Sequence, residues 1–115
     1  MKNLIVDSHA HIVMPAELYR HFAELVSARA NPILRDNYKG PEDELLRQAT
    51  EPLIKLMDKN GTDVQFISPR PYMMAHSIKP AQVSAEWNRS VNSVIHRQCM
   101  MFPERLRGVA GLPQY

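Results

Sequence analysis

Short β-rich segments alternate with long stretches of helical periodicity along this chain, and that order restricts the folds open to it. Three segments rich in apolar and β-branched residues predict strands, near 3–7, 62–68 and 107–112. Because strands joined by helical crossovers pair in parallel, we expect an α/β fold with a parallel sheet. The first segment is continuously apolar rather than alternating, which predicts a strand buried on both faces.

Two helical patterns are expected between the first two strands. After Pro15, apolar residues recur at helical spacing, at Leu18, Phe22, Leu25 and Val26. The second pattern covers 42–59, and Asn60-Gly61 follows it as a left-handed C-terminal cap. Pro52 is expected to break or kink this helix, and Thr50 to cap the helix that restarts there.

A third helical pattern follows Pro80. Its apolar face contains Trp87 and predicts core packing rather than a cofactor site. Cys99 lies in the same pattern and is expected to act as a small buried hydrophobic residue, not as a nucleophile. His21 and His96 also fall within helical patterns, and we expect them to be structural or exposed.

The composition argues against several classes of function. The chain has 115 residues and a net charge of +2, with no concentrated stretch of Lys and Arg, so no nucleic-acid partner is expected. No apolar run approaches the ~20 residues that span a bilayer, and the first residues lack a signal-peptide core. A single cysteine cannot form an internal disulfide. We therefore expect a soluble, cytoplasmic protein with no membrane partner.

Asp7, His9 and His11 form the polar end of the first predicted strand. Side chains two apart on an extended backbone point to the same side, so all three are expected to share one face. Two imidazoles that converge on one point are a common start of a site for zinc or another divalent metal. The alternative is a pair of polar residues at the mouth of an ordinary strand, because two ligands are fewer than a zinc site uses.

The loop after the second predicted strand carries several polar side chains. Arg70 follows that strand directly, where its guanidinium could grip a carboxylate with two parallel hydrogen bonds. The alternative is a surface arginine in a turn between two prolines. Tyr72, His76 and Lys79 lie on the same loop, and for each of them solvated loop positions are the alternative to a role in a site.

These residues carry a resemblance to a known family. The opening strand with Asp7-Ser8-His9-Ala10-His11 resembles the metal-binding start of the amidohydrolase superfamily. The second half resembles the amidohydrolase-related branch, and within it most closely the 4-oxalomesaconate hydratase family. The matching segments are Gly61-Thr62-Asp63, Ile67-Ser68-Pro69-Arg70-Pro71, Lys79-Pro80-Ala81, Ile95-His96-Arg97-Gln98-Cys99, Pro103-Glu104 and Val109-Ala110-Gly111-Leu112-Pro113-Gln114. The His-x-His is shared across the superfamily, whereas the later segments are more specific.

The resemblance implies a (β/α)8 TIM barrel of the metal-dependent hydrolase type. Residues 1–115 would form its N-terminal segment, with about three of its βα units. His9 and His11 would ligate Zn²⁺ or another divalent metal at the C-terminal mouth. Asp7 could orient one of these imidazoles, and the alternative is that it only ends the strand. The further strands, the further ligands and the general acid/base are expected beyond Tyr115, so no catalytic residue is assigned within this chain.

The resemblance also implies a reaction. It is that of a metal-dependent hydratase (a lyase), which adds water to the C=C bond of an unsaturated keto polycarboxylate from aromatic-compound catabolism. Arg70 and Tyr72 would bind this small anionic carboxylate substrate, and we expect a homo-oligomer. A metal-dependent decarboxylase or an amide or ester hydrolase of the same superfamily is an open alternative, because the His-x-His serves all of them. A different class is an inactive barrel fragment that self-associates through its open edge.

Overall fold

A three-stranded parallel sheet forms one layer of the protein. The computed structural model describes residues 3–31 and 38–114. The strands lie in the order β1-β2-β3 and comprise β1 (Val6–His11), β2 (Val64–Ser68) and β3 (Leu106–Gly108). Both strand pairs are parallel, which confirms the predicted α/β fold with a parallel sheet. The (β/α)8 barrel stays a prediction.

The described connections contain the predicted helices. These are α1 (Ala16–Ser27), α3 (Asp43–Asn60) and α4 (Ala81–Met101), with a 3₁₀ turn, η1 (Pro71–Met73), before α4. Helices α1 and α4 each begin directly after a proline, Pro15 and Pro80. Gly61 ends α3 with a φ of 71°, which is the predicted left-handed cap. Within residues 3–31 and 38–114, no helix combines the length and apolar character needed to cross a membrane.

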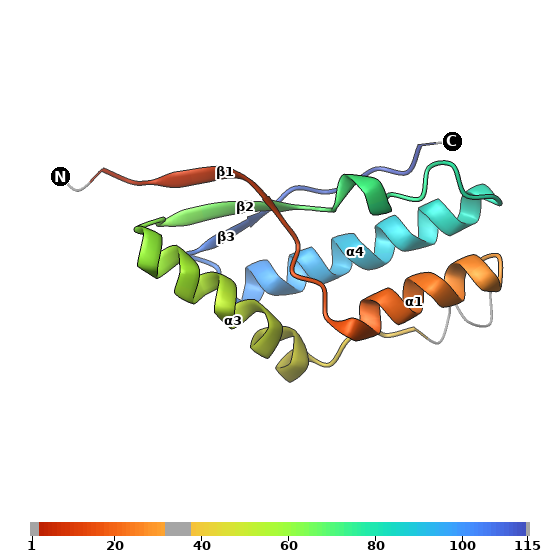
Figure 1. Cartoon of the computed structure of the whole chain (residues 1–115), viewed down its shortest axis with the longest axis horizontal. Helices are drawn as coiled ribbons and strands as arrows, with labels where there is room; N and C mark the ends of the chain where they lie inside the picture. The colour runs from red at the N-terminus through yellow and green to blue at the C-terminus, as the bar shows by residue number, and fades with distance from the viewer. Residues whose placement is uncertain (1–2, 32–37, 115) are drawn as a thin grey trace.

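The core lies between the sheet and the helices, which are gathered on one side of it (Figure 1). On β2, Gln65 and Ile67 are buried, whereas the residues between and beside them are only half-buried. The apolar face of α4 is buried as predicted, through Val83, Trp87, Val91, Val94 and Ile95. Cys99 packs partly buried against this core, and burial raises the pKa of its thiol, so it stays protonated, as expected for a structural residue.

The expectation that the first strand is buried on both faces is wrong. Leu4 is 67% exposed, Ile5 52% and Val6 45%. The physical reason is that β1 is an edge strand of the described sheet and that the helices cover only one face. A continuous apolar run indicates that both faces of a strand can be buried, but burial of the second face requires another layer of structure to cover it.

Two strands also differ from their predicted limits. Strand β1 begins at Val6, not residue 3, and it continues through both histidines to His11. Strand β3 is confined to Leu106–Gly108, where it pairs with Gln65–Ile67 of β2. Strand β1 thus pairs along the whole of β2, from Val64 to Ser68, whereas β3 pairs only with the middle of β2.

The predicted break at Pro52 is also wrong, since α3 runs continuously through it. Thr50 is fully buried inside the helix, where its hydroxyl donates to the Leu46 carbonyl oxygen at 2.7 Å and accepts from Gln98 Nε2 at 3.0 Å. Thr50 is therefore a helix-interior residue and not an N-cap. Pro52 removes one N–H from the exposed side of the helix, where water can satisfy the carbonyl of Gln48.

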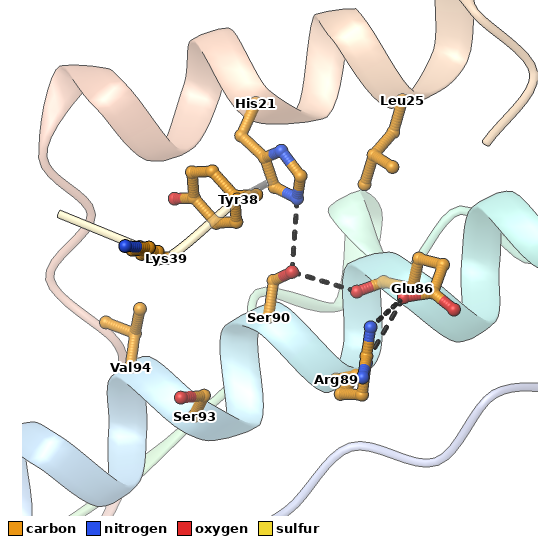
Figure 2. A pocket seen from close by; sticks show the side chains of 10 residues that line it. His21, Leu25, Tyr38, Lys39, Glu86, Arg89, Ser90, Ser93 and Val94 are labelled. Carbon is orange, nitrogen blue, oxygen red and sulfur yellow. Dashed lines mark hydrogen bonds and ion pairs between the residues drawn. The ribbon is translucent and has the colours of Figure 1, made fainter. Parts of the chain in front are cut away.

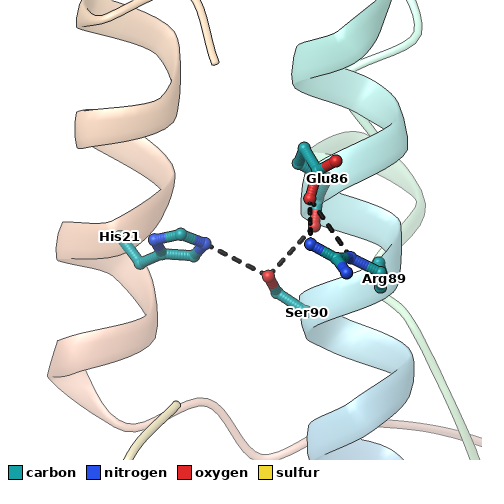
Figure 3. Close-up of polar contacts among 4 residues, drawn as sticks. All are labelled: His21, Glu86, Arg89 and Ser90. Carbon is teal, nitrogen blue, oxygen red and sulfur yellow. Dashed lines mark hydrogen bonds and ion pairs between the residues drawn. The ribbon is translucent and has the colours of Figure 1, made fainter. Parts of the chain in front are cut away.

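A buried histidine connects α1 to α4. Figure 3 shows His21 of α1 pointing at Ser90 of α4, with His21 Nε2 and Ser90 Oγ 3.1 Å apart. The Ser90 hydroxyl donates to the backbone oxygen of Glu86 at 3.0 Å. Because a hydroxyl has one proton, His21 must be the donor in the contact with Ser90. The pair is therefore a helix–helix contact, which confirms the structural role expected for His21, while His96 is exposed.

This contact predicts a loss of stability in acid. Burial lowers the pKa of His21 below its ordinary value, against the opposing effect of the Glu24 and Glu86 carboxylates. Above about pH 6.5 the residue is neutral in both states and contributes nothing to the pH dependence. Below that value only the unfolded chain takes up the proton readily, so the free energy of unfolding falls as pH falls.

Denaturant unfolding measured from about pH 7.5 to about pH 5.5 checks this prediction. We expect His21→Gln to flatten the decrease in unfolding free energy, and the control His96→Gln, at an exposed position of α4, to leave it unchanged. Equal slopes for wild type and His21→Gln would contradict it.

Candidate functional site

Strand β1 carries an irregularity at the histidine motif. Asp7 pairs with Gln65 and Ala10 with Ile67, so three steps along β1 match two steps along β2. One residue of β1 is therefore extra, as in a β-bulge. The Asp7 carboxylate supports this geometry, because its Oδ1 accepts the backbone N–H of His9 at 3.0 Å.

The bulge separates Asp7 from the histidines. Asp7 Oδ2 accepts a hydrogen bond from Gln65 Nε2 at 2.6 Å, and His11 Nδ1 lies 3.2 Å from Ser68 Oγ. Gln65 and Ser68 are three residues apart on a regular strand, so their side chains point to opposite faces of the sheet. The expectation that Asp7 shares a face with His11 is therefore wrong. An extra residue shifts the alternation by one position, which a sequence pattern alone does not reveal.

The Asp7 carboxylate accepts a hydrogen bond from the backbone of β1. The His9 N–H, followed by the Gln65 amide, holds the pKa of the Asp7 carboxyl below its ordinary value, and the His9 ring adds to this effect. The carboxylate is thus charged at neutral pH and fixes the strand just before the metal-ligand candidates. Its predicted role in orienting an imidazole stays a prediction.

The rings of His9 and His11 lie next to each other. Their centroids are 5.3 Å apart and the rings are nearly perpendicular, at 89°. His9 is exposed and His11 half-buried, so His9 and the uncovered part of His11 are open to solvent. The two histidine rings thus lie side by side, as the His-x-His spacing predicted.

These two imidazoles fit part of a metal site. Neutral imidazole nitrogens are ordinary ligands of Zn²⁺ and related divalent ions. Across residues 3–31 and 38–114, however, no group of three or more His, Cys, Asp or Glu side chains is placed to hold an ion. A complete coordination shell would need ligands that these residues do not provide.

The predicted substrate-binding loop begins at the same end of the sheet. Arg70 is half-buried, follows β2 after Pro69, and its backbone oxygen accepts the N–H of Met73 at 3.0 Å. The backbone of Tyr72 lies in η1, but its side chain falls outside the described part of the structure. His76 and Lys79 are exposed, as in the solvated-loop alternative.

Sequence reasoning missed two residues next to the site, Ser68 and Gln65. Each is the register partner of a residue that the motif had singled out, Ser68 of His11 and Gln65 of Asp7. The available signal was a pair of polar residues within the apolar segment 62–68. The sequence does not reveal the strand register that places these two residues opposite β1.

A separate cavity of about 340 Å³ lies away from these residues, between α1 and α4 (Figure 2). Its lining includes His21, Tyr38, Lys39, Arg89 and Ser90. Tyr38 stacks on His21 with ring centroids 3.4 Å apart, and burial raises the pKa of Tyr38 to about 12. Since Ser90 gives its proton to a backbone oxygen, His21 and Ser90 do not form a base–nucleophile pair. The histidine pair on β1 is chemically the stronger candidate site.

Comparison with known proteins finds two hydratases that match nearly the whole chain. No protein-family model matches the chain. It is 26% identical over 113 residues to 2-keto-4-carboxy-3-hexenedioate hydratase from a Sphingobium species, an alignment that covers 96% of this chain and 33% of that protein. The crystal structure of 4-oxalomesaconate hydratase from Rhodopseudomonas palustris matches it with a TM-score of 0.82 at 27% identity, over 97% of this chain and 34% of that one.

The chain therefore spans about a third of the length of these relatives. Membership of the wider amidohydrolase superfamily stays a prediction. Along nearly its whole length, the chain is homologous in sequence and fold to an N-terminal portion of 4-oxalomesaconate hydratase, which confirms the resemblance predicted from its motifs.

Proposed function

We propose that this protein takes part in the hydration of an unsaturated keto polycarboxylate from aromatic-compound catabolism. The observation that carries the proposal is the match to two hydratases along nearly the entire chain, in fold as well as sequence. The names of both relatives describe hydration of a keto acid with more than one carboxylate, which is the substrate class we propose here. The histidine pair at the end of β1 supplies the chemistry that such a reaction can use.

We also propose that the sheet belongs to a larger (β/α)8 barrel. The apolar side chains at the start of β1 are exposed, and the face of the sheet away from the helices is only half-buried. A long apolar edge of this kind is normally covered, since it otherwise pairs with other chains. The relatives are about three times as long as this chain, and in this proposal further strands and helices of the barrel would cover the exposed side chains.

His9 and His11 would hold Zn²⁺ or another divalent metal in this proposal. Such an ion supplies Lewis acidity toward an oxygen of the substrate or of water. The two imidazoles contribute neutral donors, so the ion keeps its charge. The remaining ligands and the general acid/base are not assigned to the described residues.

Arg70 would bind the substrate. Water adds across a C=C bond next to a carbonyl, so negative charge develops on the substrate beside carboxylates that are already anionic. A half-buried guanidinium at the carboxyl end of β2 can hold one carboxylate through two parallel hydrogen bonds. Tyr72, two residues further along, is proposed as a second contact to the same substrate.

The alternatives differ in what they require of the protein. A decarboxylase or a hydrolase of the same superfamily would use the same histidine pair, and only the two hydratase relatives favour hydration. A self-associating inactive fragment would be favoured by the exposed edge of β1. Homo-oligomer formation is compatible with both an enzyme and such a fragment.

One experiment separates these functions. Purified protein is analysed by size-exclusion chromatography and for metal content, and is then given 4-oxalomesaconate while the loss of the conjugated double bond is followed by absorbance. Bound zinc together with hydration supports the proposal. A self-associated protein that contains no metal and shows no turnover would overturn the proposal in favour of the inactive fragment. Release of carbon dioxide instead of hydration would favour the decarboxylase.

Loss of either histidine should remove the metal. We expect His9→Ala and His11→Ala each to lower the metal bound by the complete protein to background, because the site then loses one of its two imidazoles in this chain. Elemental analysis after dialysis measures the metal per chain. His96→Ala is the matched control, since His96 is exposed on α4 and should leave the metal content unchanged. Full metal content in the His9 and His11 variants would count against this site.

Removal of the Arg70 guanidinium should weaken substrate binding. A charge-assisted hydrogen bond contributes about 1.5–3 kcal/mol, so Arg70→Ala should raise KM by about tenfold or more. Arg70→Lys keeps the charge but loses the planar fork, and an intermediate KM is expected. Steady-state kinetics and thermal unfolding of both variants give the two readouts. An unchanged KM would return Arg70 to the surface-turn alternative.

A further inference from the structure

Ser68 joins the candidate metal ligand His11 to the backbone of β1. It is the last residue of β2, is half-buried, and pairs in register with His11. Its Oγ lies 3.2 Å from His11 Nδ1 and 3.1 Å from the backbone oxygen of Ala10. The Ser68 backbone is held as well, because its carbonyl oxygen accepts the N–H of Ile12 at 2.8 Å.

The protons in this arrangement can be assigned by counting donors and acceptors. A carbonyl oxygen only accepts, so the contact between Ser68 Oγ and Ala10 is a hydrogen bond only if the serine donates. The hydroxyl then has no second proton for His11. The contact at 3.2 Å is satisfied when Nδ1 of His11 carries the proton and donates it to Ser68 Oγ. A neutral His11 in this tautomer has its lone pair on Nε2.

We propose that Ser68 is a positioning residue that holds His11 in the Nδ1–H tautomer and presents Nε2 to a divalent metal. This inference rests on the proposed metal-dependent function. Ligating histidines typically donate their other ring N–H to an acceptor that fixes the tautomer and the ring plane. Here the acceptor is a hydroxyl on the neighbouring strand, and it is itself fixed by its bond to Ala10.

The same contact also restricts His9. The His9 ring meets the His11 ring edge to face, with centroids 5.3 Å apart. His9 is exposed, whereas His11 is half-buried and bonded to Ser68. The His11 ring, which is held by Ser68, therefore limits the positions open to the more exposed His9 ring. One serine on β2 thus helps to preorganise both imidazoles.

The first test reads the tautomer without any metal. Long-range ¹⁵N–¹H NMR spectra of the metal-free protein at about pH 8, where histidine is neutral, distinguish a protonated ring nitrogen from one with a lone pair. We expect Nδ1–H for His11 in wild type and in Ser68→Thr, which keeps the hydroxyl. Ser68→Ala should shift His11 toward Nε2–H. Ser93→Ala, at an exposed position of α4, is the control for loss of a hydroxyl.

The second test reads metal binding. Titration of each protein with Zn²⁺ should show affinity reduced by about 10-fold or more in Ser68→Ala, and near wild-type affinity in Ser68→Thr and Ser93→Ala. An Nε2–H tautomer in wild type, or one that Ser68→Ala leaves unchanged, would overturn the role of Ser68 whatever the metal does. A serine-dependent Nδ1–H tautomer without Zn²⁺ binding would support the hydrogen bond and overturn the proposed metal function instead.

Discussion

The pairing of β1 with β2 is the interaction on which the candidate site depends. These strands are more than fifty residues apart in sequence, yet their side chains make two specific contacts, Asp7 to Gln65 and His11 to Ser68. The pairing starts at Ile5, whose backbone N–H donates to Asp63 Oδ2 at 2.9 Å and whose oxygen accepts the Asp63 N–H at 2.9 Å. Between these points the bulge sets which face each polar side chain occupies. The position of the histidines is thus set by the pairing of β1 with β2, and not by the His-x-His motif alone.

Helix α4 holds the segments around this strand pair in place through amide side chains as well as apolar packing. Gln98 is fully buried, and its amide donates to the Val13 oxygen and to Thr50, each at 3.0 Å. It thereby connects α4 both to α3 and to the segment that leaves β1. Asn92 exchanges two hydrogen bonds of 2.8 Å with the backbone of Gly111, beyond β3. Buried amides are stabilising only when bonded, so these contacts also favour one arrangement over other packings.

Burial differs between the two faces of the sheet, as the proposed larger barrel would require. The face of the sheet toward the helices is a packed core, whereas its other face and the β1 edge expose apolar side chains. Two imidazoles and an arginine lie at the carboxyl end of the strands, where barrel enzymes place their chemistry. The proposed hydration of an anionic keto acid can use a Lewis acid and cationic groups, and the residues at this end of the sheet fit both roles.

The sequence by itself determined the types of element, their order and the adjacency of the two histidines. Local periodicity decides whether a segment is a strand or a helix, and an i, i+2 spacing brings two rings together where no bulge turns one of them away, as from His9 to His11. The cap at Gly61 also followed from the local sequence, since glycine lacks the side chain that disfavours a left-handed conformation. The motifs also indicated the hydratase resemblance, because they are read directly from residue order.

Only the tertiary structure decided the relations between segments. The extra residue in β1 turned Asp7 away from His11, and the open sheet face left Leu4 exposed. Thr50 bonds to Gln98 of α4 from the interior of α3, which continues past Pro52. Ser68 gained its place beside His11 through strand register alone. Each of these outcomes depends on a partner distant in the chain, whose position no local pattern of residues contains.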